Sequence, residues 1–235
     1  MKKHIPNLIT SMNALCGTAA IIFATMYNDI RLASLLIIFA MIFDFFDGMS
    51  ARLLHVKSEI GKELDSLSDV ISFGIAPAVL AFILLENEMN SGEYSGVFYD
   101  VIKFLPLIIA PFSAYRLAKF NLDSRQTTSF IGMPTPANAL FWIGLVALSL
   151  MNPILYDSIF GNIWILSFCI IITSVLLISE IPMFSLKISN FSWIDNKIRY
   201  IYLFSLIILF FIFGFSAISL IIPLYIIYSL IFRKS

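Results

Sequence analysis

Hydrophobic residues in this chain occur in long runs with few charges, rather than with the short periods of a soluble fold. A helix of about 20 apolar residues crosses the roughly 30 Å hydrocarbon core of a bilayer. The pattern predicts eight membrane-spanning helices, at about residues 6–27, 32–54, 61–86, 100–121, 136–151, 158–179, 199–213 and 216–232. We interpret the first run as a span and not as a cleaved signal peptide, because Pro6 interrupts its start and no small-residue cleavage site closes it.

The last two spans come from one uncharged stretch, residues 200–232. As a single helix it would be about 50 Å long at 1.5 Å per residue, which overshoots the bilayer core. Gly214 lies in its middle and predicts a tight hairpin of two short spans. We therefore expect an all-α transmembrane bundle with a six-helix core at residues 1–180. An inner loop and a C-terminal transmembrane hairpin follow at 181–235.

The basic residues are distributed unevenly across this topology. With the N-terminus inside, every Lys and Arg except Arg31 and Lys103 falls on the inner side. Such an excess of positive charge is typical of cytoplasmic loops. The sequence predicts a multi-pass protein of the cell (inner) membrane, with both termini in the cytoplasm.

Composition supports the same class. The chain is 60% hydrophobic and 13% charged, with a formal net charge of zero, whereas soluble domains average about 45–50% apolar and 25% charged. These values exclude a soluble or disordered protein, and the balanced charge gives no sign of a nucleic-acid partner. Cys16, Cys169, His4 and His55 show no metal-binding spacing.

Four aspartates break the rule that membrane helices avoid charge. Asp44 and Asp47 are three residues apart near the inner end of the second span, and Asp65 and Asp69 are four apart near the inner start of the third. Each pair lies on one helix face. Because a short link makes the two helices antiparallel neighbours, we expect the four carboxylates to converge near the inner surface. Oxygen ligands alone suit Mg²⁺, Mn²⁺ or Ca²⁺.

Small residues accompany the aspartates. Gly48, Ala51 and Gly61 remove side-chain bulk, so that a ligand can approach the backbone. Arg52 adds a cation suited to bidentate phosphate contacts. Metal ions, an arginine and a bare backbone together predict a diphosphate site.

Two other interpretations of the aspartates stay open at this point. They could form structural ion pairs with Arg52, Lys57 and Lys62, or they could line the path of a divalent-cation transporter. The transporter is disfavoured because the acids gather at one membrane side and no inverted repeat supplies a second half.

The full spacing is more specific than its parts. It reads Asp44-Phe-Phe-Asp47-Gly48-Met-Ser-Ala51-Arg52 and, after eight residues, Gly61-Lys-Glu-Leu-Asp65-Ser-Leu-Ser-Asp69. This fits DxxDGxxAR…GxxxDxxxD and resembles the signature of the CDP-alcohol phosphatidyltransferase family of integral membrane enzymes. The resemblance implies a helical bundle with a cytosolic active site that displaces CMP from a CDP-linked substrate.

The resemblance also implies roles for individual residues. Two divalent cations, Mg²⁺ or Mn²⁺, would be held by Asp44, Asp47 and Asp65. Asp69 would complete the metal site and act as the general base on the acceptor hydroxyl. The CDP moiety would contact Asp47, Gly48, Ala51, Arg52 and Gly61, together with Asn7 and Thr10 of the first span. Enzymes of this family are commonly homodimers, so the resemblance implies that this chain also forms a homodimer.

Further stretches are similar to bacterial family members that use L-serine as acceptor: Pro6-Asn7-Leu-Ile-Thr10-Ser-Met-Asn13, Ser72-Phe-Gly74-Ile-Ala-Pro77, Arg116-Leu-Ala-Lys119-Phe-Asn121 and Phe130-Ile-Gly132-Met-Pro134-Thr-Pro136. The implied reaction joins CDP-diacylglycerol and L-serine into phosphatidylserine and CMP. Arg116 is the candidate for the serine carboxylate, and Asn121, Gly132 and Pro134 are expected to shape that pocket.

The nearest rival acceptors are glycerol 3-phosphate and an inositol phosphate. Each brings an extra phosphate and should need a larger group of cations beside the catalytic aspartate. The inner loops offer Arg116, Lys119 and Arg125 on that side. This small number favours serine.

Overall fold

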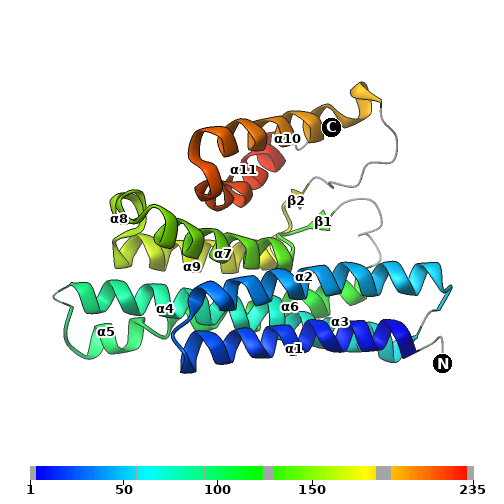
Figure 1. Ribbon diagram of the computed structural model, residues 1–235, viewed down its shortest axis with the longest axis horizontal. Helices are drawn as coiled ribbons and strands as arrows, with labels where there is room; N and C mark the ends of the chain where they lie inside the picture. The colour runs from blue at the N-terminus through cyan, green and yellow to red at the C-terminus, as the bar shows by residue number, and fades with distance from the viewer. Residues whose placement is uncertain (1–3, 57, 93, 124–129, 184–191, 232–235) are drawn as a thin grey trace.

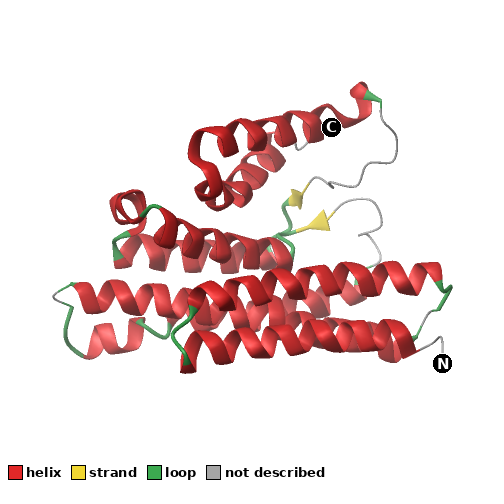
Figure 2. Ribbon diagram, in the orientation of Figure 1, coloured by secondary structure: helices red, strands yellow, loops and turns green. Residues whose placement is uncertain are grey.

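The computed structural model describes residues 4–56, 58–92, 94–123, 130–183 and 192–231. The described chain is almost entirely helical (Figure 2), and its two strands, β1 and β2, have two residues each and pair antiparallel. The elements in chain order are α1 (Ile5–Met26), α2 (Ile30–Leu53), α3 (Glu59–Asp69), α4 (Ala76–Ser91), α5 (Val97–Ile102), α6 (Ile109–Leu122), β1 (Phe130–Ile131), α7 (Thr135–Met151), α8 (Pro153–Phe160), α9 (Ile163–Ile178), β2 (Pro182–Met183), α10 (Trp193–Phe213) and α11 (Ile218–Ile231).

The structure confirms an all-α protein with several helices able to cross a membrane. In the described residues, five helical segments are long and apolar enough, and the bent pair α8–α9 makes a sixth if it counts as one span. The shorter apolar helices α7 and α11 correspond to the predicted spans 136–151 and 216–232. The total of eight spans stays a prediction.

The sixth predicted span, 158–179, differs from the structure. Most of it is α9, and its first residues belong to the end of α8, which is bent by 78° from α9 at a short break. The side chains of Asn152 and Asn162 each accept a backbone hydrogen bond at the start of one helix. Because an asparagine cap starts a new helix, the chain turns at Gly161 instead of continuing straight.

Local signals also set the turns before and after α2. Asn28 and His55 adopt a positive φ of 52°, a conformation that lets the chain reverse. The side chain of Asp29 then accepts a hydrogen bond from the Leu32 amide at 2.8 Å, and that of Ser58 accepts one from the Gly61 amide at 3.3 Å. These caps fix where α2 and α3 begin.

A π-helical turn, Val70–Ile75, joins α3 to α4. Such turns insert an extra residue and are frequent at functional sites. The Ser72 hydroxyl donates to the main-chain oxygen of Asn13 at 2.9 Å. On the opposite side, a Cβ at Gly74 would lie 3.1 Å from the Ser113 Cβ. The turn is therefore packed between α1 and α6, directly after Asp69.

The helices form layers (Figure 1). The helices α1, α2, α3, α4 and α6 lie together in one bundle, α7 and α9 cover it, and α10 and α11 lie beyond α7. Trp142 and Leu145 of α7 are fully buried between these layers. The helix break that the sequence predicts at Gly214 is present, and Gly214 has a φ of +58° between α10 and α11.

Candidate active site

Three of the four predicted aspartates lie together. Asp44 and Asp47 of α2 and Asp65 of α3 each offer a carboxylate oxygen, and these oxygens all lie within 4.8 Å of one another. The i, i+3 spacing places the first pair on one face of α2. The chain reverses between α2 and α3 (Figure 1), and Asp65 lies close to Asp44 and Asp47 after this reversal.

Asp44, Asp47 and Asp65 form no ion pair with a basic side chain of the described residues. Each of the four carboxylates interacts electrostatically with the other three. Among the described residues, no Lys or Arg nitrogen lies within 4.0 Å of them, and the Asp65 Oδ1 atom is buried without a hydrogen-bond donor. Ion pairs with Arg52 or Lys62 are therefore absent in this part of the chain, while Lys57 lies outside the described residues. An all-oxygen group with unmet acceptor capacity fits a hard divalent cation.

The helix α1 contacts two of these carboxylates from the side. The Thr10 hydroxyl donates to Asp47 Oδ2 at 2.6 Å, and Asn13 Nδ2 donates to Asp69 Oδ1 at 3.1 Å. Sequence reasoning assigned Thr10 to the nucleotide and did not pair Asn13 with Asp69. The available signal was the three-residue spacing of Thr10 and Asn13, which puts both on one face of α1.

A cavity of about 640 Å³ opens beside the carboxylates. Its lining residues come from the start of α1, the end of α2 and the start of α3: Pro6, Asn7, Thr10, Asp47, Gly48, Ala51, Val56, Ser58, Glu59, Gly61, Lys62 and Asp65. Every residue predicted to contact CDP is in this set except Arg52. The Arg52 side chain instead donates from Nε to the main-chain oxygen of Gly48 at 3.0 Å.

The glycines of the motif keep this cavity open. A Cβ at Gly48 would meet no atom within 4 Å, so the position faces free space. A Cβ at Gly61 would lie 3.1 Å from Asn7 Oδ1. The sequence did not predict four further lining residues. Val56 and Ser58 lie in the link before α3, Glu59 is the first residue of α3, and Lys62 is at a variable position of the motif.

Arg116 of α6 is buried and lies on the Asp69 side of the site. Its guanidinium interacts electrostatically with Asp69, and its Nε atom has no hydrogen-bond partner among the described residues. The guanidinium carbon lies 5.5 Å from the centre of the Phe120 ring. A buried cation with an unused donor can receive an anionic group such as a carboxylate.

The other three residues predicted for the acceptor pocket have structural contacts. Asn121 Nδ2 donates to Ser66 Oγ at 2.8 Å, which ties α6 to α3. Gly132 has a φ of +75°, and a Cβ there would lie 2.6 Å from the Ser179 carbonyl oxygen. Pro134 is the residue that immediately precedes α7. Their contact with an acceptor stays a prediction.

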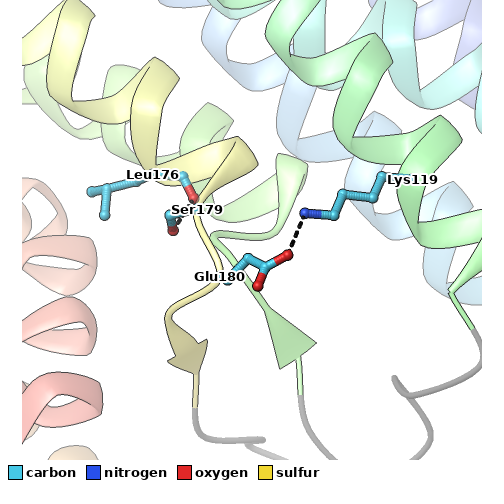
Figure 3. A network of polar contacts seen from close by, with 4 residues as sticks. All are labelled: Lys119, Leu176, Ser179 and Glu180. Carbon is cyan, nitrogen blue, oxygen red and sulfur yellow. Dashed lines mark hydrogen bonds and ion pairs between the residues drawn. The ribbon is translucent and has the colours of Figure 1, made fainter.

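Lys119 is bound to an acidic partner. Its Nζ lies 3.0 Å from Glu180 Oε1, in an ion pair that joins α6 to the segment after α9 (Figure 3). In the same segment the Ser179 hydroxyl donates to the Leu176 carbonyl oxygen at 2.9 Å. The charge of Lys119 is thus partly neutralised, and Arg125 lies outside the described residues.

Comparison with known proteins agrees with this geometry. The model of the CDP-alcohol phosphatidyltransferase family matches residues 3–176. A Bacillus subtilis protein named CDP-diacylglycerol–serine O-phosphatidyltransferase is 39% identical over 154 residues, which are 65% of this chain and 79% of that protein.

Two further relatives carry the same name. One from Mycobacterium bovis is 33% identical over 186 residues, covering 76% of this chain and 60% of that protein. One from Helicobacter pylori strain 26695 is 33% identical over 234 residues, covering 96% of this chain and 89% of that protein. The family match spans well over half of the chain and includes all four aspartates, so the chain belongs to the CDP-alcohol phosphatidyltransferase family.

Proposed function

We propose that the protein transfers the phosphatidyl group of CDP-diacylglycerol to the hydroxyl of L-serine, giving phosphatidylserine and CMP. The observation that carries this proposal is the cavity of about 640 Å³ whose wall holds Asp47 and Asp65 beside the small residues Gly48 and Ala51. Relatives named for this reaction, at 33–39% identity, support it.

The carboxylates would hold the divalent cations that the family implies. Asp44, Asp47 and Asp65 fit Mg²⁺ or Mn²⁺ because their oxygens converge and lack basic partners, with Asp69 as a further ligand for a pair of ions. When bound there, such cations would neutralise the diphosphate and stabilise the departing CMP. The bare backbone at Gly48 and Gly61 lets the nucleotide approach this wall.

Asp69 is the proposed general base. The serine oxygen forms a bond to the phosphatidyl phosphorus while the bond from that phosphorus to the CMP oxygen breaks. The hydroxyl proton passes to the Asp69 carboxylate, which is needed because an alcohol is a weak nucleophile. Arg116, which interacts with Asp69, would receive the serine carboxylate and so place the hydroxyl near the base.

The cation content beside Asp69 favours serine over acceptors that carry a phosphate. Among the described residues of α6, Arg116 has an unused donor while Lys119 is paired with Glu180. One available guanidinium suits one carboxylate. A phosphate carries more charge and would need more cations.

CMP release from detergent-purified protein tests the proposal. The assay contains CDP-diacylglycerol and Mn²⁺ or Mg²⁺, with L-serine, glycerol 3-phosphate or an inositol phosphate added separately. We expect CMP release only with L-serine, its loss in Asp69→Asn, and wild-type activity in the matched exposed control Asp100→Asn. CMP release with another acceptor would show that the acceptor is not serine but would leave the proposed type of reaction unchanged. No release with any acceptor from folded protein would favour a cation transporter.

Localisation and assembly complete the proposal. We propose that the enzyme lies in the cell (inner) membrane with its site and both termini toward the cytoplasm, as the placement of basic residues predicts. We also propose a homodimer. Light scattering of the purified protein, corrected for detergent, should give twice the chain mass, and a value of one chain mass would refute the dimer.

A further inference from the structure

Asn13 is a wholly buried polar residue in the middle of α1, with 0% of its surface exposed. Its Nδ2 donates to Asp69 Oδ1 at 3.1 Å. Its own Oδ1 accepts no hydrogen bond within the part of the chain that the structure describes. A buried amide is costly unless it is hydrogen-bonded, so the contact with Asp69 is what compensates for placing Asn13 here.

The backbone around this contact is tightly held. The Ser72 hydroxyl donates to the main-chain oxygen of Asn13 at 2.9 Å. One turn further along α1, a Cβ at Gly17 would lie 2.7 Å from Ser72 Cα. The helix α1 and the π-helical turn are therefore as close as their backbones allow, which fixes the separation of Asn13 from Asp69.

A second residue on the same face of α1 also donates a hydrogen bond to a carboxylate of the site, because the Thr10 hydroxyl donates to Asp47. Asp47 belongs to the group of three carboxylates that could hold a cation, whereas Asp69 is outside that group. The two donors of α1 thus contact two carboxylates of the site, and Asn13 contacts the one that is the proposed proton acceptor.

We propose that Asn13 is a positioning residue for Asp69. By binding Oδ1, the amide fixes the rotation of the carboxyl group and leaves its other oxygen to take the proton of the acceptor hydroxyl. This inference rests on the proposed function, in which Asp69 is the base. Small errors in the placement of a catalytic group cost up to about 100-fold in rate.

Kinetics of two variants test the positioning role. Asn13→Leu keeps much of the volume but has no donor, while Asn13→Ser keeps a small donor. We expect Asn13→Leu to lower kcat by about 10- to 100-fold, with KM for CDP-diacylglycerol unchanged, and Asn13→Ser to recover part of the loss. Thr173→Val is the matched control, because the buried Thr173 hydroxyl donates to carbonyl oxygens of its own helix, α9.

A second measurement does not depend on turnover. The substitution Asn13→Leu should lower the thermal unfolding temperature more when it is made in the wild type than when it is made in the Asp69→Ala variant. Only the wild type has the hydrogen bond from Asn13 to Asp69 to lose. Equal shifts would overturn the contact. If Asn13→Leu folds and keeps the wild-type kcat, the positioning role is overturned. If Asn13→Leu does not fold, the positioning role is overturned when Asn13→Ser keeps the wild-type kcat and shifts the unfolding temperature equally in the wild type and in Asp69→Ala.

The outcomes separate this inference from the proposed function. Turnover of the wild type with L-serine decides the function, and the ratio of variant to wild type decides the role of Asn13. If another acceptor is used, the same ratio is measured with that acceptor. Absence of CMP release from the wild type with every acceptor overturns both.

Discussion

The four aspartates of the motif differ in the residues that surround them. Asp44, Asp47 and Asp65 converge with little compensation, while Asp69 lies one turn beyond Asp65 and is bound by Asn13. Spacing along a helix places such residues on a face. It does not say which neighbour will donate to them, and here Asn13 donates to Asp69, the residue proposed to take the proton.

Asp65→Asn keeps the shape of the side chain and removes its charge. We expect kcat to fall on the order of 100-fold or more, because a ligand to a cation that stabilises charge by several kcal/mol is weakened. Without divalent cations the folded state should not lose stability, since repulsion within the group decreases. CMP release at rising Mn²⁺ concentrations and thermal unfolding measure the two effects, and full activity at low Mn²⁺ would contradict this role.

Two glycines allow a matched comparison. A Cβ at Gly17 would lie 2.7 Å from Ser72 Cα, whereas one at Gly48 would meet nothing within 4 Å. Gly17→Ala should destabilise the protein by about 1–3 kcal/mol, because overpacking forces backbone shifts. Gly48→Ala should leave stability unchanged and raise KM for CDP-diacylglycerol. Unfolding in denaturant measures the effect on stability, and steady-state kinetics measure the effect on KM. A destabilised Gly48→Ala with unchanged KM, together with a stable Gly17→Ala, would contradict the assignment of the cavity to CDP-diacylglycerol.

At the scale of elements, helix contacts depend on small residues at crossing points. The helix α7 lies between the bundle and α11 (Figure 1). A Cβ at Gly144 of α7 would lie 2.7 Å from Ser219 Cα and 2.9 Å from the Ile218 oxygen. Backbone atoms cannot rotate away as a side chain can. The C-terminal hairpin is therefore held against α7 by close approach of main chains.

Gly144→Ala should separate α11 from α7. We expect a loss of about 1–3 kcal/mol in the free energy of unfolding, the usual effect of inserting a methyl group into a packed contact. Thermal unfolding in detergent measures it. Ser149→Ala on the same helix is the control and should have little effect, because Ser149 donates to the carbonyl oxygen of Val146 within α7. Equal stability of both variants would contradict the close packing.

At the scale of the whole molecule, the distribution of charge predicts how the bundle lies in the membrane. Leu53, at the end of α2, and Val97, at the start of α5, are both exposed. The predicted topology puts the first on the inner side and the second on the outer side. These two positions are suited to chemical labelling.

Labelling in whole cells tests the topology. In a background with Cys16 and Cys169 replaced by serine, Val97→Cys should react with a membrane-impermeant maleimide added outside. Leu53→Cys should react only after the cells are permeabilised. The opposite pattern would invert the orientation and place the site outside.

Removal of the cations should affect the whole fold. A ligand that binds only the native state stabilises it by mass action. A chelator should therefore abolish CMP release and lower the unfolding temperature of the wild type, and Mn²⁺ should restore both. The unfolding temperature of Asp65→Asn should respond less to chelator. An equal response in both proteins would place the stabilising cation elsewhere.

The sequence by itself determined the all-helical membrane class, the turn at Gly214 and the family motif. These follow from local properties, because run length, helical period and residue spacing need no knowledge of neighbouring helices. The four aspartates could be found for the same reason.

Only the tertiary structure decided which helix completes the site. Packing of α1 against α2 and α3 brought Thr10 and Asn13 to Asp47 and Asp69. Contacts between residues far apart in the chain arise from the fit of whole helix surfaces, which no short spacing encodes.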